Sequence, residues 1–103
     1  MNHVETLLPK VKSNLILTHD EDNELLRTII LSALDYAQTY QKIKRWGRTL
    51  PPSTSQAVVM LASHFYESRD GGTGGFFADN SRAAEQVWTA VNRLLLINRD
   101  YRF

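Results

Sequence analysis

Residues 24–43, ELLRTIILSALDYAQTYQKI, contain the clearest helical pattern in the sequence. Their apolar residues recur at steps of three and four, which places them in a wide stripe along one side of a helix. The charged and amide residues of this stretch fall mostly outside the stripe. We therefore expect a long helix that is buried on one side. The predicted stripe consists of Leu25, Leu26, Ile29, Ile30, Ala33, Leu34, Ala37, Tyr40 and Ile43.

The stretch before it predicts a shorter helix that ends near Leu17. Pro9 lies early in this stretch, so we expect it in the opening turn, where proline is tolerated. An acidic turn at 20–22 follows, and we expect Asp20 to cap the long helix, because acidic side chains favour a helix amino terminus. The apolar positions of the short helix are Val4, Leu7, Leu8, Val11, Leu15 and Ile16.

The remainder of the chain predicts two more helices. The prolines at 51–52 disfavour helical backbone in the residues before them, which predicts a connection at 46–52. The glycines within 71–75 predict a flexible loop between the third and fourth helices. The fold class we expect is all-α, a small bundle of four helices. The expected caps are Ser53 or Thr54 for the third helix, and Asp79, Asn80 or Ser81 for the fourth.

Length and composition are those of an ordinary globular domain. The chain has 103 residues, 43% hydrophobic and 22% charged, so we expect a single domain over 1–103. A net charge of +1 excludes a protein that holds nucleic acid over its whole surface. The absence of cysteine excludes disulfides and cysteine-based metal sites. Without a long apolar run or a signal-peptide pattern, we expect a cytoplasmic origin and no membrane partner.

Candidate catalytic residues are few. His64 and Glu67 lie three residues apart, a spacing at which two side chains of one helix can approach one metal ion. A di-metal bundle needs such a pair twice, and the sequence has it once. We interpret the pair as a half-exposed histidine beside a surface acid, and we expect no cofactor, no metal and no enzymatic activity. A metal-dependent enzyme stays as a third hypothesis, which predicts stoichiometric metal uptake.

A basic patch follows the long helix. Four cations surround Trp46 within seven residues, an arrangement that can contact phosphate and stack on a base. The alternative is structural: cations near a helix carboxyl end complement its dipole, while Trp46 packs under the loop. The patch alone does not decide between these interpretations. Its cations are Lys42, Lys44, Arg45 and Arg48.

Three segments, in this order, resemble the head-tail connector (adaptor) family of long-tailed double-stranded-DNA bacteriophages. The first is LPKVKSNL at 8–15, followed by the acidic turn and the long helix. The second is AVVMLASHFYESR at 57–69, after a Leu-Pro step, and its last six residues are the most specific part of the resemblance. The third is the apolar carboxyl-terminal helix with RDYR at 99–102.

The resemblance implies a structural virion protein. Members of that family are understood to assemble as a homo-oligomeric ring beneath the portal, of about twelve subunits, which extends the DNA channel. The implied partners are other copies of the chain, the portal protein, the next tail-proximal completion protein and non-specific DNA in the channel. The implied location is the head–tail interface of the virion, after synthesis in the host cytoplasm.

A ring subunit needs apolar surface on more than one face, because it meets its two neighbours through different surfaces. Leu31 lies opposite the core stripe, and the apolar run at 94–97 adds more surface unless a crowded core uses it. The competing hypothesis is a small helical nucleic-acid-binding or regulatory protein that uses 42–48 and binds DNA salt-sensitively as a monomer or dimer. The expected contacts with subunits or partners are Leu31, Tyr66, Glu67, Arg69 and Tyr101, and those with channel DNA are Lys42, Lys44, Arg45 and Arg48.

Overall fold

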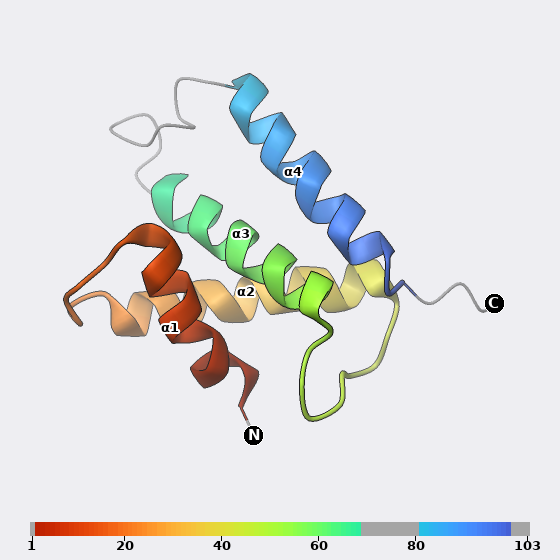
Figure 1. The fold of residues 1–103 in the computed structure, drawn as a ribbon, viewed down its shortest axis with the longest axis horizontal. Helices are drawn as coiled ribbons and strands as arrows, with labels where there is room; N and C mark the ends of the chain where they lie inside the picture. The colour runs from red at the N-terminus through yellow and green to blue at the C-terminus, as the bar shows by residue number, and fades with distance from the viewer. Residues whose placement is uncertain (1, 69–80, 100–103) are drawn as a thin grey trace.

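The computed structural model describes residues 2–68 and 81–99, and these form the expected all-α fold (Figure 1). Within these residues α3 is the central helix and packs against the other three. α2 also contacts α1 and α4, whereas α1 and α4 do not contact each other in the described part of the chain. The expected loop at 71–75 lies outside the described residues. The helices are α1 (His3–Leu15), α2 (Asn23–Gln41), α3 (Pro52–Ser68) and α4 (Ser81–Leu96).

The hydrophobic core lies where these helices meet α3. The centre of the predicted α2 stripe is buried as expected. Leu25 is 39% exposed instead, because it falls outside the narrower stripe that the neighbouring helices cover. The buried apolar residues are Val4, Leu7, Leu8, Val11, Leu26, Ile30, Ala33, Leu34, Ala37, Ala57, Val58, Leu61, Ala62, Tyr66, Val91 and Leu95.

The start of α1 corrects the expected position of Pro9. Asn2 caps the helix, because its Oδ1 accepts a hydrogen bond of 2.9 Å from the backbone N–H of Val4. The helix therefore begins at His3, before the first apolar residue. Pro9 consequently lies inside the helix, in its second turn, and the prediction of an opening-turn proline was wrong.

The start of α2 corrects the expected role of Asp20. The N-cap residue is Asp22, and its side chain makes no capping hydrogen bond. The two acids serve tertiary contacts: Asp20 accepts a hydrogen bond from Lys12 Nζ, and Asp22 accepts one from the Tyr66 hydroxyl. The hydrogen bond and positive charge of Lys12 lower the pKa of Asp20 below its usual value.

The third and fourth helices begin near the predicted positions. α3 starts at Pro52, which needs no partner for a backbone N–H, so neither Ser53 nor Thr54 is its cap. Thr54 is instead fully buried. α4 starts at Ser81, and the other expected cap residues, Asp79 and Asn80, lie outside the described residues.

Both α1 and α2 end in a residue with left-handed backbone. Ile16 and Lys42 each have φ 58°, and in this position the backbone N–H groups reach back to the last carbonyls of the helix. Leu17 N–H donates to the Lys12 carbonyl at 2.9 Å. This reversal turns the Ile16 side chain to solvent, so the prediction that Ile16 belongs to the core stripe was wrong; the side chain is 84% exposed.

Candidate functional site

The connection between α2 and α3 carries the predicted basic patch. We call residues 42–50 the basic loop; it contains four cations and no acidic residue. All four cationic side chains are exposed. The positive charge of this loop is therefore available to a partner. These four residues are Lys42, Lys44, Arg45 and Arg48.

A buried hydrogen-bond network fixes the basic loop to the core. Gln41, the last residue of α2, has no exposed surface. Its Nε2 donates to Thr54 Oγ1 at 2.8 Å and to the Leu95 carbonyl at 3.0 Å. Its Oε1 accepts a hydrogen bond of 2.9 Å from Trp46 Nε1. One amide thus joins α2, α3, α4 and the loop, and each of its polar atoms has a partner.

Neither Gln41 nor Thr54 was predicted to organise this network. The signal is their spacing: Gln41 follows Ala37 by four residues and therefore continues the buried side of α2. Thr54 similarly precedes the buried Ala57 and Val58 by three and four residues. A polar residue in register with a core stripe can indicate a buried network rather than the end of the stripe.

Trp46 packs beneath the basic loop, as in the structural interpretation of the patch. Its side chain is partly buried against the core. The ring of His3 packs edge-on against it, with ring centroids 6.0 Å apart and planes at 85°. Stacking on a nucleic-acid base would compete with these contacts and with the bond to Gln41.

The outer face of α2 brings two predicted contact residues together. Leu31 is 58% exposed and lies on the side of α2 opposite the core. It lines a hollow of 430 Å³ together with Asp35, Arg45 and Trp46, so a predicted subunit contact and a predicted DNA contact share one surface. Asn2, His3 and Val4, at the start of α1, also line the hollow.

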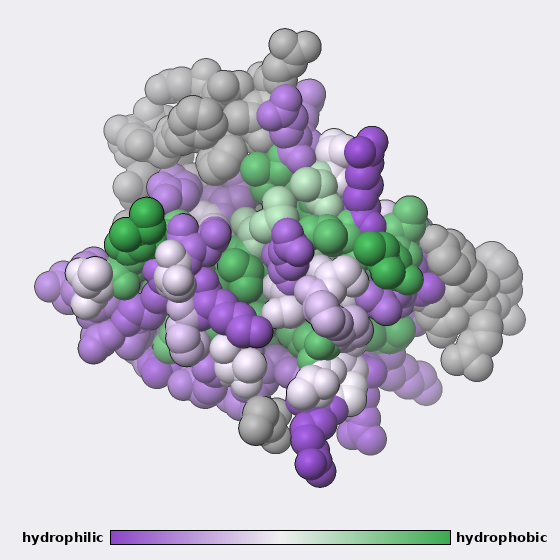
Figure 2. All heavy atoms as spheres, in the orientation of Figure 1, coloured by the Kyte–Doolittle hydropathy of each residue, from purple (hydrophilic) through white to green (hydrophobic). Residues whose placement is uncertain are grey.

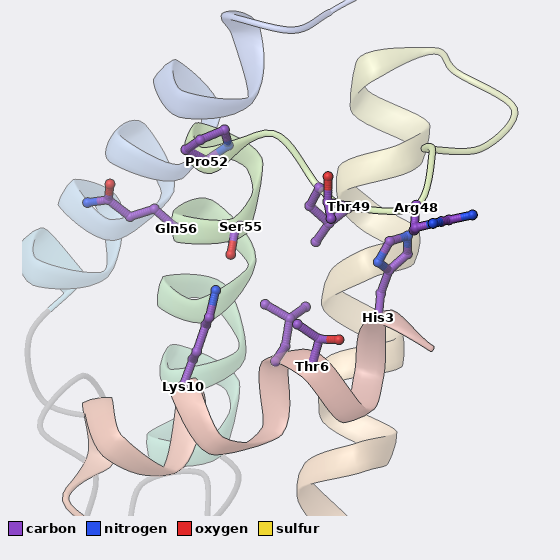
Figure 3. A pocket seen from close by; sticks show the side chains of 10 residues that line it. His3, Thr6, Lys10, Arg48, Thr49, Pro52, Ser55 and Gln56 are labelled. Atoms are coloured by element: carbon purple, nitrogen blue, oxygen red, sulfur yellow. The ribbon is translucent and has the colours of Figure 1, made fainter. Parts of the chain in front are cut away.

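A second hollow, which we call the α1 groove, lies between α1, the basic loop and the start of α3 (Figure 3). Its volume is 380 Å³. Figure 3 shows the Lys10 side chain rising toward Ser55, whereas Arg48 points away from the groove. The lining also includes the apolar residues Leu7 and Leu50.

The predicted contact residues of α3 have different surroundings. Tyr66 is buried, and its hydroxyl donates a hydrogen bond to Asp22, which connects α3 to the acidic turn of the same chain. Glu67 is exposed. Arg69 and Tyr101 lie outside the described residues.

His64 is more buried than expected. It is 9% exposed, so the interpretation as a half-exposed histidine was wrong. The reason is the central place of α3: Trp88 of α4 packs edge-on against the His64 ring, with centroids 6.1 Å apart. Burial lowers the pKa of His64. His64 and Glu67 line one groove of 270 Å³, and no group of three or more potential metal ligands comes together within residues 2–68 and 81–99.

Apolar surface remains outside the core. Figure 2 shows hydrophobic patches among polar residues over α3 and α4. The apolar run at 94–97 is divided: Leu95 is buried, whereas Leu96 and Ile97 are exposed. None of the described helices has the length and hydropathy needed to cross a membrane. The exposed large hydrophobic residues of the described part are Ile16, Leu25, Leu31, Leu96 and Ile97.

A comparison with protein families identifies a match over most of the sequence. Residues 5–94 match the family model described as phage gp6-like head-tail connector protein. The matched segment runs from α1 into α4 and includes the basic loop. The comparisons with curated proteins and with solved structures gave no match. Since the family model spans most of the sequence, the chain belongs to the phage gp6-like head-tail connector family, whose proteins have a structural role in the virion.

Proposed function

We propose that the chain is one subunit of a homo-oligomeric ring beneath the portal, which extends the DNA channel and docks the next tail-proximal protein. The family match over residues 5–94 carries this proposal, because a connector must bind both a head component and a tail component. The chain would be made in the host cytoplasm and act at the head–tail interface of the virion. A ring of about twelve subunits is the expectation from resemblance.

The distribution of apolar surface supports ring assembly. Each subunit of a closed ring meets its neighbours through two different surfaces. Exposed large hydrophobic residues lie on three different helices or at their ends: after α1 (Ile16), on α2 (Leu25 and Leu31) and at the end of α4 (Leu96 and Ile97). Leu31, Tyr66 and the exposed Glu67 remain candidates for these contacts, and Arg69 and Tyr101 remain proposals from the resemblance.

The basic loop supports a channel-lining role. A ring repeats each charge around its axis, so four exposed cations per subunit make a basic collar when the loop faces the lumen. Such a collar contacts phosphates without reading bases. Trp46 does not support the alternative of a nucleic-acid-binding regulator, because its indole N–H donates a hydrogen bond to Gln41.

The solution mass of the purified chain tests ring assembly. Sedimentation at rising concentration, with imaging of any large species, should show rings, either alone or after addition of the portal vertex. Monomers that never join a circular complex, even on that vertex, would contradict the proposal. Tight sequence-selective DNA binding by a monomer would favour the regulator.

Charge reversal in the basic loop tests the collar. The double variant Arg45→Glu and Arg48→Glu should reduce DNA packaging or retention in phage particles. Arg93→Glu is the matched control, because Arg93 is an exposed cation on α4 outside the basic loop. Normal packaging and retention by the loop variant would exclude the collar while leaving ring assembly untouched.

A further inference from the structure

Ile16 combines two properties that folding does not favour. It is the most exposed large hydrophobic residue in the described part of the chain. It also has φ 58° and ψ 44°, a left-handed conformation that glycine adopts easily and β-branched residues rarely adopt. Residues held in strained backbone conformations cluster at functional sites. The isoleucine therefore points to a contact that the single chain does not make.

Acidic side chains follow Ile16 in the connection between α1 and α2. Asp20 and Glu21 are exposed, and the turn folds back on α1, because Asp20 accepts a hydrogen bond from Lys12 of its last turn. We call Ile16, Asp20 and Glu21 the acidic knob. This knob presents an apolar side chain together with the negative charge of Glu21, whereas the charge of Asp20 is paired with Lys12.

The α1 groove has the complementary properties. Leu7, Leu50 and Pro52 supply apolar lining, and Lys10, which rises into the groove, supplies positive charge. None of the residues that line the groove is acidic. Figure 3 shows Lys10 rising into the space between α1 and the start of α3, where an incoming carboxylate would meet it.

We propose that the acidic knob of one subunit docks in the α1 groove of the next copy of the chain. Within one chain Ile16 does not enter the groove, because its side chain is 84% exposed and it is not among the residues that line the groove. A contact between two different surfaces of identical subunits is the kind that closes a ring, so this inference rests on the proposed function.

Disulfide trapping tests the contact directly, because the natural chain contains no cysteine. A chain with Ile16→Cys should form a disulfide with a chain carrying Ser55→Cys, a groove residue that faces Lys10 in Figure 3. A double variant with both cysteines should give a ladder of covalent multimers. Ile97→Cys paired with Ser55→Cys is the control, since Ile97 is exposed but lies outside the knob.

Failure of this contact is distinguishable from failure of the ring. Absence of 16–55 disulfides at every concentration, including in samples in which imaging shows rings, overturns the docking and leaves the proposed function standing. Absence of both disulfides and rings, also on the portal vertex, overturns both. Equal trapping of the 97–55 control pair would likewise contradict the assigned contact.

A second variant separates association from folding. Ile16→Gly removes the knob and also relieves the left-handed strain, so it should keep or raise the melting temperature. Self-association should weaken about tenfold or more, as expected for loss of a buried apolar side chain. Lys10→Glu should weaken it too, and adding Glu21→Lys should restore it. Unchanged association of Ile16→Gly, or no rescue by Glu21→Lys, would contradict the docking.

Discussion

Lys42 places a positive charge at a backbone position where glycine would be more stable. It ends α2 with φ 58°, a conformation that costs an L-residue with a side chain more than glycine. Lys42→Gly should therefore raise the free energy of unfolding by about 0.5–1 kcal/mol, after the greater freedom of glycine in the unfolded chain is counted. Urea denaturation of the purified variant measures this change.

Lys44→Gly is the matched control for Lys42→Gly. It removes the same charge from the same loop, but Lys44 does not have positive φ. This control should leave stability unchanged or lower it. Equal stabilisation by both substitutions would show that the loss of charge, and not the relief of backbone strain, is responsible.

His64 gives the fold a dependence on pH. Burial lowers its pKa in the folded chain below the unfolded value of about 6.5. The unfolded chain therefore binds the proton more readily than the folded chain. The contribution of neutral His64 to the free energy of unfolding is fully present above the unfolded pKa, and it is lost as the pH drops through 6.5 toward the folded pKa. Denaturation midpoints should decrease over this window.

His64→Gln should remove this decrease, whatever its effect on absolute stability. The comparison is made between slopes, because the substitution also changes packing against Trp88. The lowered pKa of Asp20 acts separately, since that carboxyl loses stabilising charge only as the pH falls below its ordinary value of 3.8. The same slope in wild type and His64→Gln would mean that another group causes the loss.

At the scale of elements, the existence of the four helices follows from apolar spacing, whereas their ends do not. Spacing reports which side of a helix is buried, and it predicted the centre of α2 well. The ends depend on contacts between distant residues. Asp20 resembles a cap in sequence, yet it binds Lys12, and Asp22 binds Tyr66, 44 residues away. No local pattern contains that information.

Gln41 forms hydrogen bonds that connect three helices and the basic loop, so its replacement should destabilise the fold. Gln41→Leu keeps the approximate volume but leaves the Trp46 N–H and the Leu95 carbonyl without their partner. Unsatisfied buried polar groups of this kind should lower the free energy of unfolding by about 2–4 kcal/mol. Thermal and urea denaturation measure the loss.

Gln86→Leu serves as the control for the same chemical change at an exposed position of α4. It should alter stability by no more than about 0.5 kcal/mol. If Gln41→Leu were equally mild, a rearranged core or a water molecule would have replaced the amide. In that case the basic loop would not depend on this network for its position.

At the scale of the molecule, the sequence shows which residues are charged but not which surfaces they share. The basic loop was predictable because its four cations are neighbours in the chain. The hollow that joins His3 to Leu31 and Arg45, and the groove that joins Lys10 to Ser55, were not, because each combines elements far apart in sequence. Such surfaces arise only when the helices pack.

The assembled ring should bind DNA in a way that the single chain does not. One chain has a net charge of +1, whereas a ring sets many basic loops around one axis. Duplex DNA should therefore bind rings without sequence preference, and the affinity should fall steeply as salt rises, because each phosphate contact releases counterions. Titrations of separated rings and monomers at several salt concentrations measure both slopes.

The basic loop should account for most of this salt dependence. Lys44→Gln combined with Arg45→Gln should make the slope of log affinity against log salt shallower, since each lost phosphate contact reduces it by about one. Arg93→Gln removes an exposed cation from α4 and should leave the slope unchanged if that residue lies away from the lumen. Were the two variants to reduce the slope equally per charge, the ring would attract DNA through its general charge, and the basic loop would have no special place in the channel.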